Sequence, residues 1–571
     1  MMINFLIEVD FNKNRFFEIS KGKDTGFYKV TENKEYTVFF SKNFKCEELK
    51  TKIKNSVTAD FSFLDGQKFK DGIIIVVNKF NNTITIYNDI FGYNHVFYKK
   101  DDKKILVSNS FNLLNDNKKS IAPHAILDLV LFHYLVGSTT PNNNIKKLRG
   151  GNKLFITKTE CVEIPTKPIV DFFKDRYEPK KHTLKNINQI LQNEIKYRLD
   201  NSKSTFLTLT GGFDSRTLLS VLIQSQIPFE TITWGGKGNL QNIVSQEISS
   251  SFGIKHKDVF LSDDFLKNIF HYSQEIIKTN SENPIVLDMP QYLYMSKNIP
   301  ESNIITGFMG SEIIRGPSVS SQTTLTYIAA KLALSNSLDE FYDFVYIFLN
   351  ELSLFNKEYL NQILPEYIEK FKCFFRKESN THKRALEFLF YEKYVGFFKN
   401  AEKLHKPHNL INPYMSVDFI TTILNQKTSI LNYSVFKTTA KDHFDFYKVY
   451  AQIIKSAFPK MLNTRVDRGY KIKHLTSFYH YPWLVYYHLK NHVMKRSKVK
   501  YAKPLDYPLW MKQMILDNLQ NSALLDSDLF EMKAINTTLA NFEKGQLQDE
   551  LIQKKLIILT GINLYNKSIS N

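Results

Sequence analysis

The pattern of the sequence changes part-way along the chain, and this change limits the folds that are open to it. In the later part, short apolar runs rich in β-branched residues alternate with runs of helical spacing, as in TFLTLT (205–210), RTLLSVLIQ (216–224) and FETITW (229–234). Such alternation is typical of a parallel sheet, because a crossover helix must carry the chain back before the next strand can run in the same direction. We therefore expect a Rossmann-like domain with a parallel sheet over 186–571, with mostly helices beyond about residue 325.

The earlier part of the chain reads as strands with few helices. GIIIVVNKF (72–80) and NTITIYND (82–89) are separated by a polar break and predict a hairpin. HAILDLVLFHYLVG (124–137) has helical spacing and closes on a glycine, which predicts a helix that ends there. The charged segment KDRYEPKKHTLKN (174–186) then separates the two patterns. We expect a first, strand-rich domain over 1–175 and place the boundary in this charged segment.

Composition favours a globular protein without a nucleic-acid partner. The formal net charge is +19, but the lysines are scattered, which indicates a solvated surface more than a nucleic-acid footprint. The densest basic stretch, KRSKVKYAK (495–503), fits either an exposed linker or helix face, or a site for an acidic substrate. The three cysteines lie far apart and imply no disulfide framework. An acidic residue interrupts the first apolar run, and no run approaches the roughly 18 residues that span a membrane, so we expect a cytoplasmic protein with no membrane partner.

A glycine elbow, TGGFDS, lies between a predicted strand and a predicted helix, where α/β proteins bind their ligands. Gly211 and Gly212 let backbone N–H groups turn toward an anion, and the start of the helix adds further free N–H groups. The hydroxyls of Thr210 and Ser215 add donors, so the loop suits phosphate or pyrophosphate. Asp214 would repel a bare phosphate, and its presence therefore argues for a bridging Mg²⁺.

The expected reaction class follows from what this elbow lacks. The Gly-Lys-Ser/Thr ending of a Walker A loop is missing, which disfavours transfer of the γ-phosphoryl group. A site that holds pyrophosphate and Mg²⁺ instead suits cleavage of ATP between the α- and β-phosphates, which gives an adenylate. The local pattern by itself leaves an ordinary turn as the alternative, because Gly-Gly-x-Asp is also good turn sequence.

The elbow resembles the Ser-Gly-Gly-x-Asp-Ser pyrophosphate loop of N-type ATP pyrophosphatases. More particularly, the chain resembles asparagine synthetase and its relatives, the β-lactam synthetases and lasso-peptide cyclases. Further segments are similar to motifs of this family in the same order, and together they cover nearly the whole chain. They are NDIFGYNHVFY (88–98) and IKKLRGGNKLFI (145–156) for the glutaminase domain, and ITGFMGSEIIRG (305–316), INPYMSVDF (411–419) and TRVDRGYKI (464–472) for the synthetase domain.

The resemblance implies a fold and a set of ligands. Residues 1–175 would form the family's glutaminase-like, Ntn-type antiparallel αββα sandwich, and residues 186–571 its ATP pyrophosphatase domain. Gly307 and Gly310 of the second loop would join the elbow in binding ATP and pyrophosphate. The ligands of Mg²⁺ would come from Asp214, Ser311 and Glu312.

Several departures separate this chain from asparagine synthetase itself. The family's glutaminase uses an N-terminal Cys as nucleophile, whereas Met2 stands here, so we expect the sandwich to lack glutaminase activity. The β-lactam synthetases and lasso cyclases share this loss, and their substrates supply the amine themselves. Ser311 replaces the family's Mg²⁺-binding Asp and is a poorer ligand. Phe308 stands where the family has Glu or a catalytic Tyr, and it cannot transfer a proton.

The catalytic groups must then come from other positions. Glu392, in the helical segment LFYEKYVGFF, is the candidate general base, and an exposed helix carboxylate is the alternative interpretation. In the fourth synthetase motif, Asp467 replaces the usual Lys. Arg468 or Lys471 would then supply the positive charge that stabilises pyrophosphate and the acyl transition state, unless both are surface charges.

The resemblance implies a ligase that forms an amide bond and converts ATP to AMP and pyrophosphate. It would adenylate a substrate carboxylate and pass the acyl group to an amine. The most specific form of this reaction, and the one that we favour, is closure of a lasso-type macrolactam. The substrate would be a small molecule or a peptide, and a protease that processes a precursor peptide stays open as a partner. The alternatives are a glutamine-hydrolysing asparagine synthetase and a non-catalytic nucleotide-binding relative. Modification of tRNA would use the basic charge but does not explain the glutaminase-like half.

Overall fold

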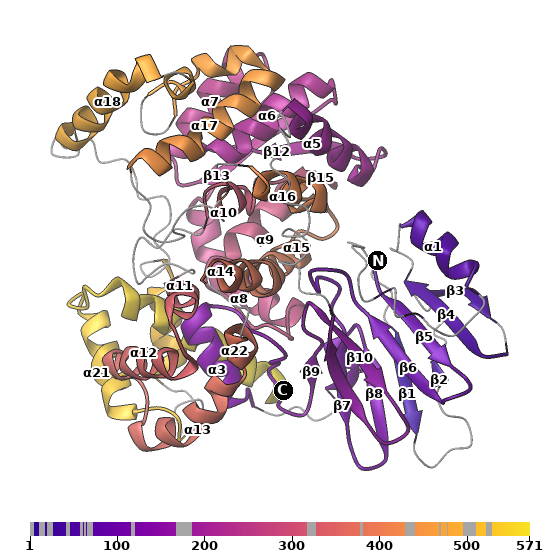
Figure 1. Cartoon of the computed structure of the whole chain (residues 1–571). Coiled ribbons are helices and arrows are strands. Elements are labelled where there is room, and N and C mark those ends of the chain that lie inside the picture. The colour runs from indigo at the N-terminus through magenta and orange to yellow at the C-terminus, as the bar shows by residue number, and fades with distance from the viewer. Residues whose placement is uncertain are drawn as a thin grey trace.

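The computed structural model (Figure 1) describes residues 5–10, 18–19, 27–32, 34–41, 46–56, 61, 64, 72–115, 120–166, 185–316, 327–376, 381–426, 429, 440–466, 470–476, 478–494, 510–520 and 528–570. This part of the chain contains two antiparallel sheets and one parallel sheet, together with many helices. The prediction of a mixed α/β protein is confirmed. Most of the segment that we expect to separate two domains lies in 167–184, outside the described residues, so the boundary stays a prediction.

The N-terminal region forms two antiparallel sheets that lie face to face (Figure 1). The first has the strand order β2 (Glu18–Ile19), β1 (Leu6–Asp10), β8 (Lys104–Ser108), β7 (Phe97–Lys100) and β9 (Lys146–Lys147). The second has the order β11 (Cys161–Pro165), β10 (Asn152–Ile156), β6 (Thr83–Tyr87), β5 (Ile74–Asn78), β4 (Tyr36–Ser41) and β3 (Phe27–Glu32). β5 and β6 pair in antiparallel register with Ile75 opposite Ile86, which confirms the predicted hairpin.

The alternation of side chains along these strands explains the layers of this region. Ile75 of β5 points into the core between the two sheets, whereas its neighbour Ile74 points to the outer face. On that outer face lies α1 (Glu47–Lys54), and α2 (Phe111–Leu114) packs on the outer face of the first sheet. The region therefore has two sheets in the middle and a helix on each outer side.

The third sheet has five parallel strands, in the order β14 (His256–Phe260), β13 (Glu230–Gly235), β12 (Ser204–Thr208), β15 (Ser302–Ile305) and β16 (Asn409–Ile411). β12 and β13 lie within two residues of the strands predicted from TFLTLT and FETITW. From β12 the chain first adds strands on one side, β13 and β14, and then on the other side, β15 and β16. The strand order therefore reverses between β12 and β15.

Both faces of the parallel sheet are buried, because successive side chains of a strand point to opposite faces. Leu207 and Ile305 belong to the apolar core on one face, and Phe206 and Ile304 belong to the core on the other. The first face is covered by α5 (Lys185–Arg198), α6 (Phe213–Ser225), α7 (Leu240–Ser251), α16 (Val417–Leu424) and α17 (Ala440–Ala457), and the second by α8 (Asp263–Thr279) and α9 (Pro290–Lys297).

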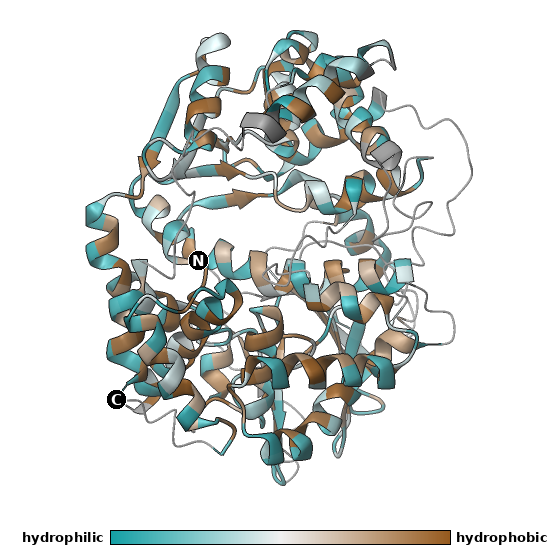
Figure 2. Ribbon diagram, turned by 90° about the vertical axis from the view of Figure 1, so that its left-hand side faces the viewer, coloured by the Kyte–Doolittle hydropathy of each residue, from teal (hydrophilic) through white to brown (hydrophobic). Residues whose placement is uncertain are grey.

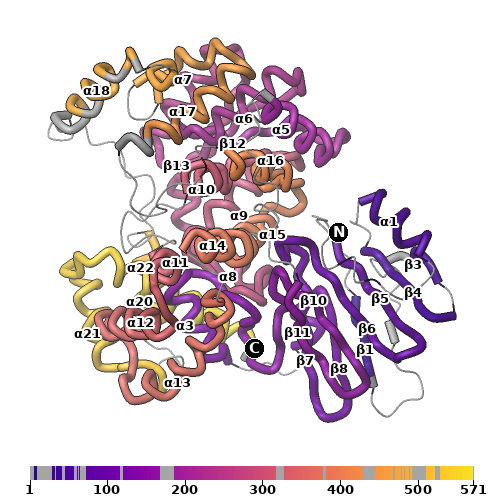
Figure 3. The backbone as a smooth tube through the Cα atoms, viewed as in Figure 1, coloured from indigo at the N-terminus to yellow at the C-terminus, as the bar shows by residue number. Residues whose placement is uncertain are grey.

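A body of helices lies beside the sandwich and below the parallel sheet in Figure 1. It contains α3 (Pro123–Phe132), α11 (Tyr327–Leu334), α12 (Leu338–Leu352), α13 (Lys357–Glu369), α20 (Lys512–Leu519), α21 (Met532–Glu543) and α22 (Glu550–Ser570). Figure 3 shows the C-terminal helices near α3, and residues of α3 and α22 share one buried cluster. Figure 2 shows apolar and polar segments alternating along the helices, and within the described ranges none of them is both long and apolar enough to cross a bilayer.

Two predicted helices differ in detail from the expectation. α3 ends at Phe132 and not at Gly137, because His133 adopts a left-handed conformation with φ of 66°. The segment LFYEKYVGFF is helical, but it winds as a π-helix, η3 (Leu389–Phe398). The remaining helices are α10 (Gly310–Arg315), η2 (Lys372–Phe375), α14 (Thr381–Phe388), α15 (Lys399–Leu404), η4 (Pro413–Met415), η6 (Pro459–Asn463), η7 (Ile472–Leu475), η8 (Phe478–His480) and α18 (Tyr481–Met494).

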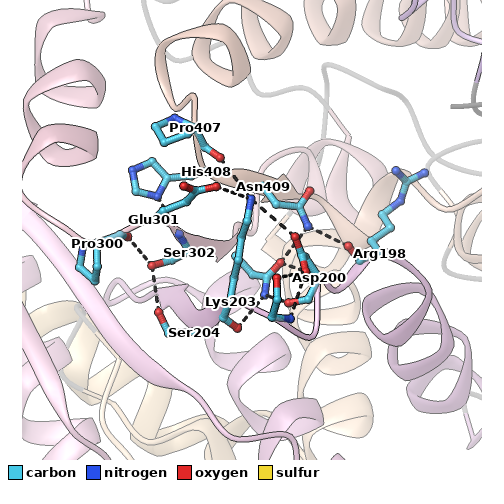
Figure 4. Close-up of polar contacts among 12 residues, drawn as sticks. Arg198, Asp200, Lys203, Ser204, Pro300, Glu301, Ser302, Pro407, His408 and Asn409 are labelled. Carbon is cyan, nitrogen blue, oxygen red and sulfur yellow. Dashed lines mark hydrogen bonds and ion pairs between the residues drawn. The ribbon is translucent and has the colours of Figure 1, made fainter. Parts of the chain in front are cut away.

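Polar contacts within the protein tie together the amino-terminal edge of the parallel sheet (Figure 4). Asn409 at the start of β16 donates from Nδ2 to the carbonyl oxygen of Arg198 at 2.8 Å. His408 accepts the backbone N–H of Ser302 at Nδ1, at 3.1 Å. Its Nε2 must then carry the proton, and it donates to the carbonyl of Ser296 at 2.9 Å. These groups are used in holding strands together, which leaves the opposite, carboxyl edge of the sheet for a ligand.

We expect Asn303→Ala to lower the free energy of unfolding by about 2–4 kcal/mol, because it strips hydrogen bonds from buried groups. Asn303 is fully buried in β15 and links Asp200 with Asn409 through its side-chain amide. The measurement is urea-induced unfolding. Lys203→Met is the control, since it removes only partly exposed contacts, which are the ion pairs with Glu301 and Asp200 and the hydrogen bond to the carbonyl of Pro407. It should cost less than about 1 kcal/mol. Equal stability of the two variants would contradict the role of this network.

Candidate active site

The candidate site lies at the carboxyl edge of the parallel sheet, between β12 and β15. The strand order reverses at this pair, and α/β proteins bind ligands at such points. The glycine elbow follows β12, and α6 begins directly after it at Phe213. The second glycine loop, residues 306–312, follows β15 and includes the first residues of α10. The fold thus brings the two loops that the sequence singles out to adjacent positions on one edge.

Side-chain oxygens shape the elbow. Ser215 Oγ accepts the backbone N–H of Thr210 at 3.1 Å and lies 3.2 Å from the Oγ1 of the same residue. The Gly212 N–H donates to Thr210 Oγ1 at 3.2 Å, and the Gly211 N–H donates to Oε1 of Gln241 in α7 at 2.6 Å. The N–H groups of the elbow therefore already bind oxygen atoms of the kind that a phosphate would supply. No motif points to Gln241, which only the fold brings here.

The two loops meet on the side chain of Asp214. Ser311 Oγ donates to Asp214 Oδ2 at 2.6 Å. A Cβ atom at Gly310 would lie only 2.6 Å from Asp214 Oδ1, and a Cβ atom at Gly307 only 2.9 Å from Asp214 Cβ. Both positions therefore need glycine for this close approach. Between them, Met309 has φ of 67°, a strained conformation of the kind found at functional sites.

Two tyrosines from distant segments complete the surroundings of Asp214. Tyr450 in α17 donates its hydroxyl to Oδ1, and Tyr414 in η4 donates to the backbone carbonyl of Asp214 at 2.7 Å. Tyr414 belongs to the segment INPYMSVDF, so the structure brings this motif to the site. Tyr450 belongs to a helix without a motif, and no signal in the sequence distinguishes it from other buried tyrosines.

The half-buried carboxyl of Asp214 has an unusual pKa. Burial raises this pKa to about 6, and the hydrogen bonds from Ser311 and Tyr450 offset only part of the effect. The nearby Glu312 raises the pKa further, while Arg315 lowers it. A cation bound at Asp214 would favour the charged form and remove this cost.

The structure brings two of the three predicted Mg²⁺ ligands together, whereas the third has a different partner. Asp214 and Ser311 touch, but Glu312 faces Lys393, whose Nζ lies 2.6 Å from its Oε1. Burial alone would raise the pKa of Glu312, but Lys393, a backbone hydrogen bond and Arg315 together keep the pKa below its ordinary value. Across the described ranges no three His, Cys, Asp or Glu side chains gather to hold a metal. Asp214 still fits Mg²⁺ when phosphate oxygens and water complete the shell, since Mg²⁺ commonly uses only one or two carboxylates.

The candidate base Glu392 is buried, so the alternative of an exposed helix carboxylate is wrong. Its carboxylate accepts Nε–H of Arg149 at 3.0 Å and the backbone N–H of Gly137 at 2.6 Å, both in the N-terminal region. The next residue of η3, Lys393, contacts the second loop through Glu312 instead. These contacts favour a structural role for Glu392 over the predicted role of general base.

The second loop has a further contact with η3 through Phe308. Its ring stacks on Phe398, with centroids 5.0 Å apart, and on Phe397, with centroids 5.7 Å apart. Phe308, which we expected to be unable to transfer a proton, thus makes an apolar contact. Together with Glu312, it fastens the loop to η3 at two points.

The segment TRVDRGYKI (464–472), which resembles a motif of the synthetase family, reaches the helix that begins at the elbow. Arg216 of α6 donates from Nη1 to Thr464 Oγ1 at 3.4 Å. Lys471 has a half-exposed side chain and forms an isolated antiparallel bridge with Arg465. Arg468, the other predicted cation, lies in 467–469, outside the described residues.

A scan of the chain against protein-family models gives no match, and a search among curated proteins gives none either. The assignment of function therefore rests on the residues and the geometry described above.

We expect Asp214→Asn to make the ligand-free protein more stable at about pH 8. The raised pKa means that the folded state binds the proton more tightly than the unfolded state, so the free energy of unfolding falls as pH rises from about 4 to about 6. Asparagine carries no charge and avoids this loss, a gain of up to about 3 kcal/mol for a shift of about two pKa units. Urea unfolding of the wild type and the variant at about pH 8 and about pH 4 measures this gain in stability. An equal gain at about pH 4, where the wild-type carboxyl is already protonated, would contradict the assignment.

Proposed function

We propose that this protein is an ATP-dependent, AMP-forming amide-bond synthetase of the asparagine synthetase-like type. It adenylates a substrate carboxylate and transfers the acyl group to an amine, in the biosynthesis of a peptide or another natural product. Closure of a lasso-type macrolactam is the version that we favour. The two-sheet N-terminal region would be the glutaminase-like sandwich and the parallel-sheet region the ATP pyrophosphatase domain.

The observation that carries this proposal is the meeting of two glycine loops on one acidic side chain. Asp214 at the start of α6 receives Ser311 from the second loop, and the glycines at 307 and 310 permit the approach. This contact lies where the strand order reverses, at the carboxyl edge of the sheet. An ordinary turn would need no second loop, no pair of close-packed glycines and no carboxyl with a raised pKa.

The donors of the elbow would bind the pyrophosphate part of ATP. Within the described part of the chain, no side-chain cap closes the start of α6 at Gly212, and the positive dipole end of the helix favours an anion there. Phosphate oxygens would replace Gln241 Oε1 on Gly211 N–H and Thr210 Oγ1 on Gly212 N–H. Asp214 would hold Mg²⁺ together with the phosphates, and the ion would neutralise part of their charge.

The chemistry needs a carboxylate oxygen to attack the α-phosphorus while the bond to pyrophosphate breaks. The amine then attacks the acyl carbon, and AMP leaves with the bonding electron pair. Holding amine and adenylate next to each other supplies much of the acceleration, because the second step becomes effectively intramolecular. Since Glu392 is engaged by Arg149 and Gly137, the amine would lose its proton to another group or to the substrate itself.

Glutamine hydrolysis is the less favoured alternative. Burial raises the pKa of Cys161 to about 12 and also raises the pKa of Cys373, so neither thiol forms a nucleophilic thiolate at neutral pH. Cys46 packs against the apolar cluster on the outer face of the sandwich, below α1. A non-catalytic nucleotide-binding protein is the second candidate, and the apolar stacking of Phe308 is the observation that favours it.

An exchange assay tests the proposal. The protein is incubated with MgATP, labelled pyrophosphate and pools of peptides that carry free carboxyl groups. We expect label to enter ATP only when a suitable carboxylate is present, and AMP to be the nucleotide product. Formation of ADP would contradict the proposal. Binding of MgATP without exchange for any pool would favour the non-catalytic alternative.

We expect Gly310→Ala to weaken MgATP binding at least about tenfold, because the added methyl group would displace Asp214. Isothermal titration calorimetry measures the affinity. Gly561→Ala is a matched control, since its Cβ would lie 2.8 Å from Val286 in the helical body, away from the loops. The control should lower stability and leave the affinity for MgATP unchanged. Equal loss of affinity in both variants would show that the effect is general destabilisation.

The affinity for MgATP should also depend on pH. Asp214 must be ionised to hold Mg²⁺, and its pKa in the free protein is about 6. We therefore expect the affinity to fall about tenfold between about pH 7 and about pH 5, as the carboxyl takes up a proton. Calorimetry in buffers of different ionisation enthalpy would detect the released proton. Affinity that stays constant over this range would contradict a role for Asp214 in metal binding.

A further inference from the structure

The two loops of the proposed ATP site contain no cationic side chain to balance the negative charge of a triphosphate. Residues 209–215 and 306–312 contain two carboxylates, Asp214 and Glu312, and no Lys or Arg. A triphosphate is strongly negative, and sites that transfer or release phosphate place cationic side chains near it in addition to the metal. Another element must therefore supply the positive charge.

Lys393 in η3 forms the ion pair that the described residues make with Glu312. Its Nζ lies 2.6 Å from Oε1 of Glu312, and the two side chains are only 9% and 21% exposed. Glu312 follows directly after Ser311, which touches Asp214 at 2.6 Å. The ammonium group is thus held next to the loop pair by a single carboxylate, in a partly dry environment where charge interactions are strong.

Other cations of the described residues near the two loops have partners of their own, although Arg315 also lies close enough to Asp214 to lower its pKa. Arg216 of α6 is buried and donates to Thr464. Arg315 at the end of α10 donates to the hydroxyl of Tyr447 at 2.8 Å and lies over its ring, with its Cζ 5.1 Å from the centroid. Arg149 pairs with Glu392 toward the N-terminal region. Lysine also suits the task better than arginine in one respect, since its flexible stem lets one charge move between two partners.

We propose that Lys393 is the counter-cation of the phosphate tail and that Glu312 restrains it in the ligand-free protein. Arrival of the phosphates draws the ammonium group away from Glu312, so the carboxylate competes with the ligand for one charge. Glu312 then acts as a restraint on Lys393 and not as a metal ligand. This inference rests on the proposed ATP site, and it assigns the residue that binds the tail.

Substitution of Lys393 and substitution of Glu312 should change the affinity for MgATP in opposite directions. Lys393→Gln should weaken binding of MgATP about 10- to 100-fold and change binding of AMP less than about twofold, because AMP lacks the tail. Glu312→Gln should tighten binding of MgATP several-fold, because it removes the competing carboxylate. The double variant should bind like Lys393→Gln, and Lys393→Arg, which keeps the charge, should retain most of the affinity. Calorimetry with ATP, AMP and metal-free ATP measures all of them.

A matched ion pair on the next helix provides the control. Lys399 and Glu402 of α15 lie 2.7 Å apart, with side chains 3% and 29% exposed. Lys399→Gln and Glu402→Gln remove a pair of similar burial and should leave the affinity for MgATP within about twofold of wild type. Thermal unfolding of all variants separates loss of fold from loss of binding. If Lys393→Gln does not fold, the affinity of Glu312→Gln for MgATP tests the inference by itself: tighter binding than in the wild type supports it, and unchanged or weaker binding overturns it.

The outcomes distinguish the possible roles of the pair. Equal weakening by Lys393→Gln and Glu312→Gln, for AMP as well as ATP, would show a purely structural pair and overturn the inference. Weakening by Glu312→Gln for MgATP but not for metal-free ATP would identify Glu312 as a metal ligand and overturn it as well. If the wild-type protein binds no ATP, the proposed function and this inference both fail, whereas the outcomes above overturn the inference and leave the ATP site in place.

Discussion

The hydrogen bonds to the half-buried carboxylate of Asp214 are the interactions on which the candidate site depends. The carboxylate joins the start of α6 to the second loop through Ser311 and to α17 through Tyr450. The contact works against the ordinary preference of a carboxylate for water, and the pKa of about 6 reflects this cost. Under the proposed function, a bound cation would remove this cost, which would favour binding of the ion together with phosphates.

The π-helix η3 links this site to the N-terminal sandwich. On one side Glu392 binds Arg149, and on the other Lys393 binds Glu312. η3 also packs closely against the segment that follows α3, since a Cβ atom at Gly396 would lie 2.5 Å from the ring of Tyr134. The position of the second loop therefore depends on contacts that begin in the sandwich. This gives the N-terminal region a structural task even if it performs no chemistry of its own, and it explains why a single segment carries two buried ions of opposite sign next to each other.

The elements of the fold and the centre of the site could be predicted from local pattern. Alternating strands and helices indicated the parallel sheet, and the glycine elbow indicated a ligand loop at the end of β12. The contacts of Tyr450 and Lys393 could not be predicted, because each lies in a helix whose spacing only shows that it is buried. Glu312 was expected beside a metal, but it pairs with Lys393, which follows it by 81 positions. A pairing at such a distance along the chain is decided by which helix faces merge into one core.

The sequence by itself determined the order of strands and helices, the place of the two glycine loops and the single carboxylate between them, because these depend on residue spacing and on the conformational freedom of glycine. Only the tertiary structure decided which side chains surround that carboxylate, which face of η3 meets the second loop, and that α3 completes the core around α22. The physical reason is that packing joins segments hundreds of residues apart. Its specificity comes from shape, burial and charge in three dimensions, and a linear pattern contains none of these directly.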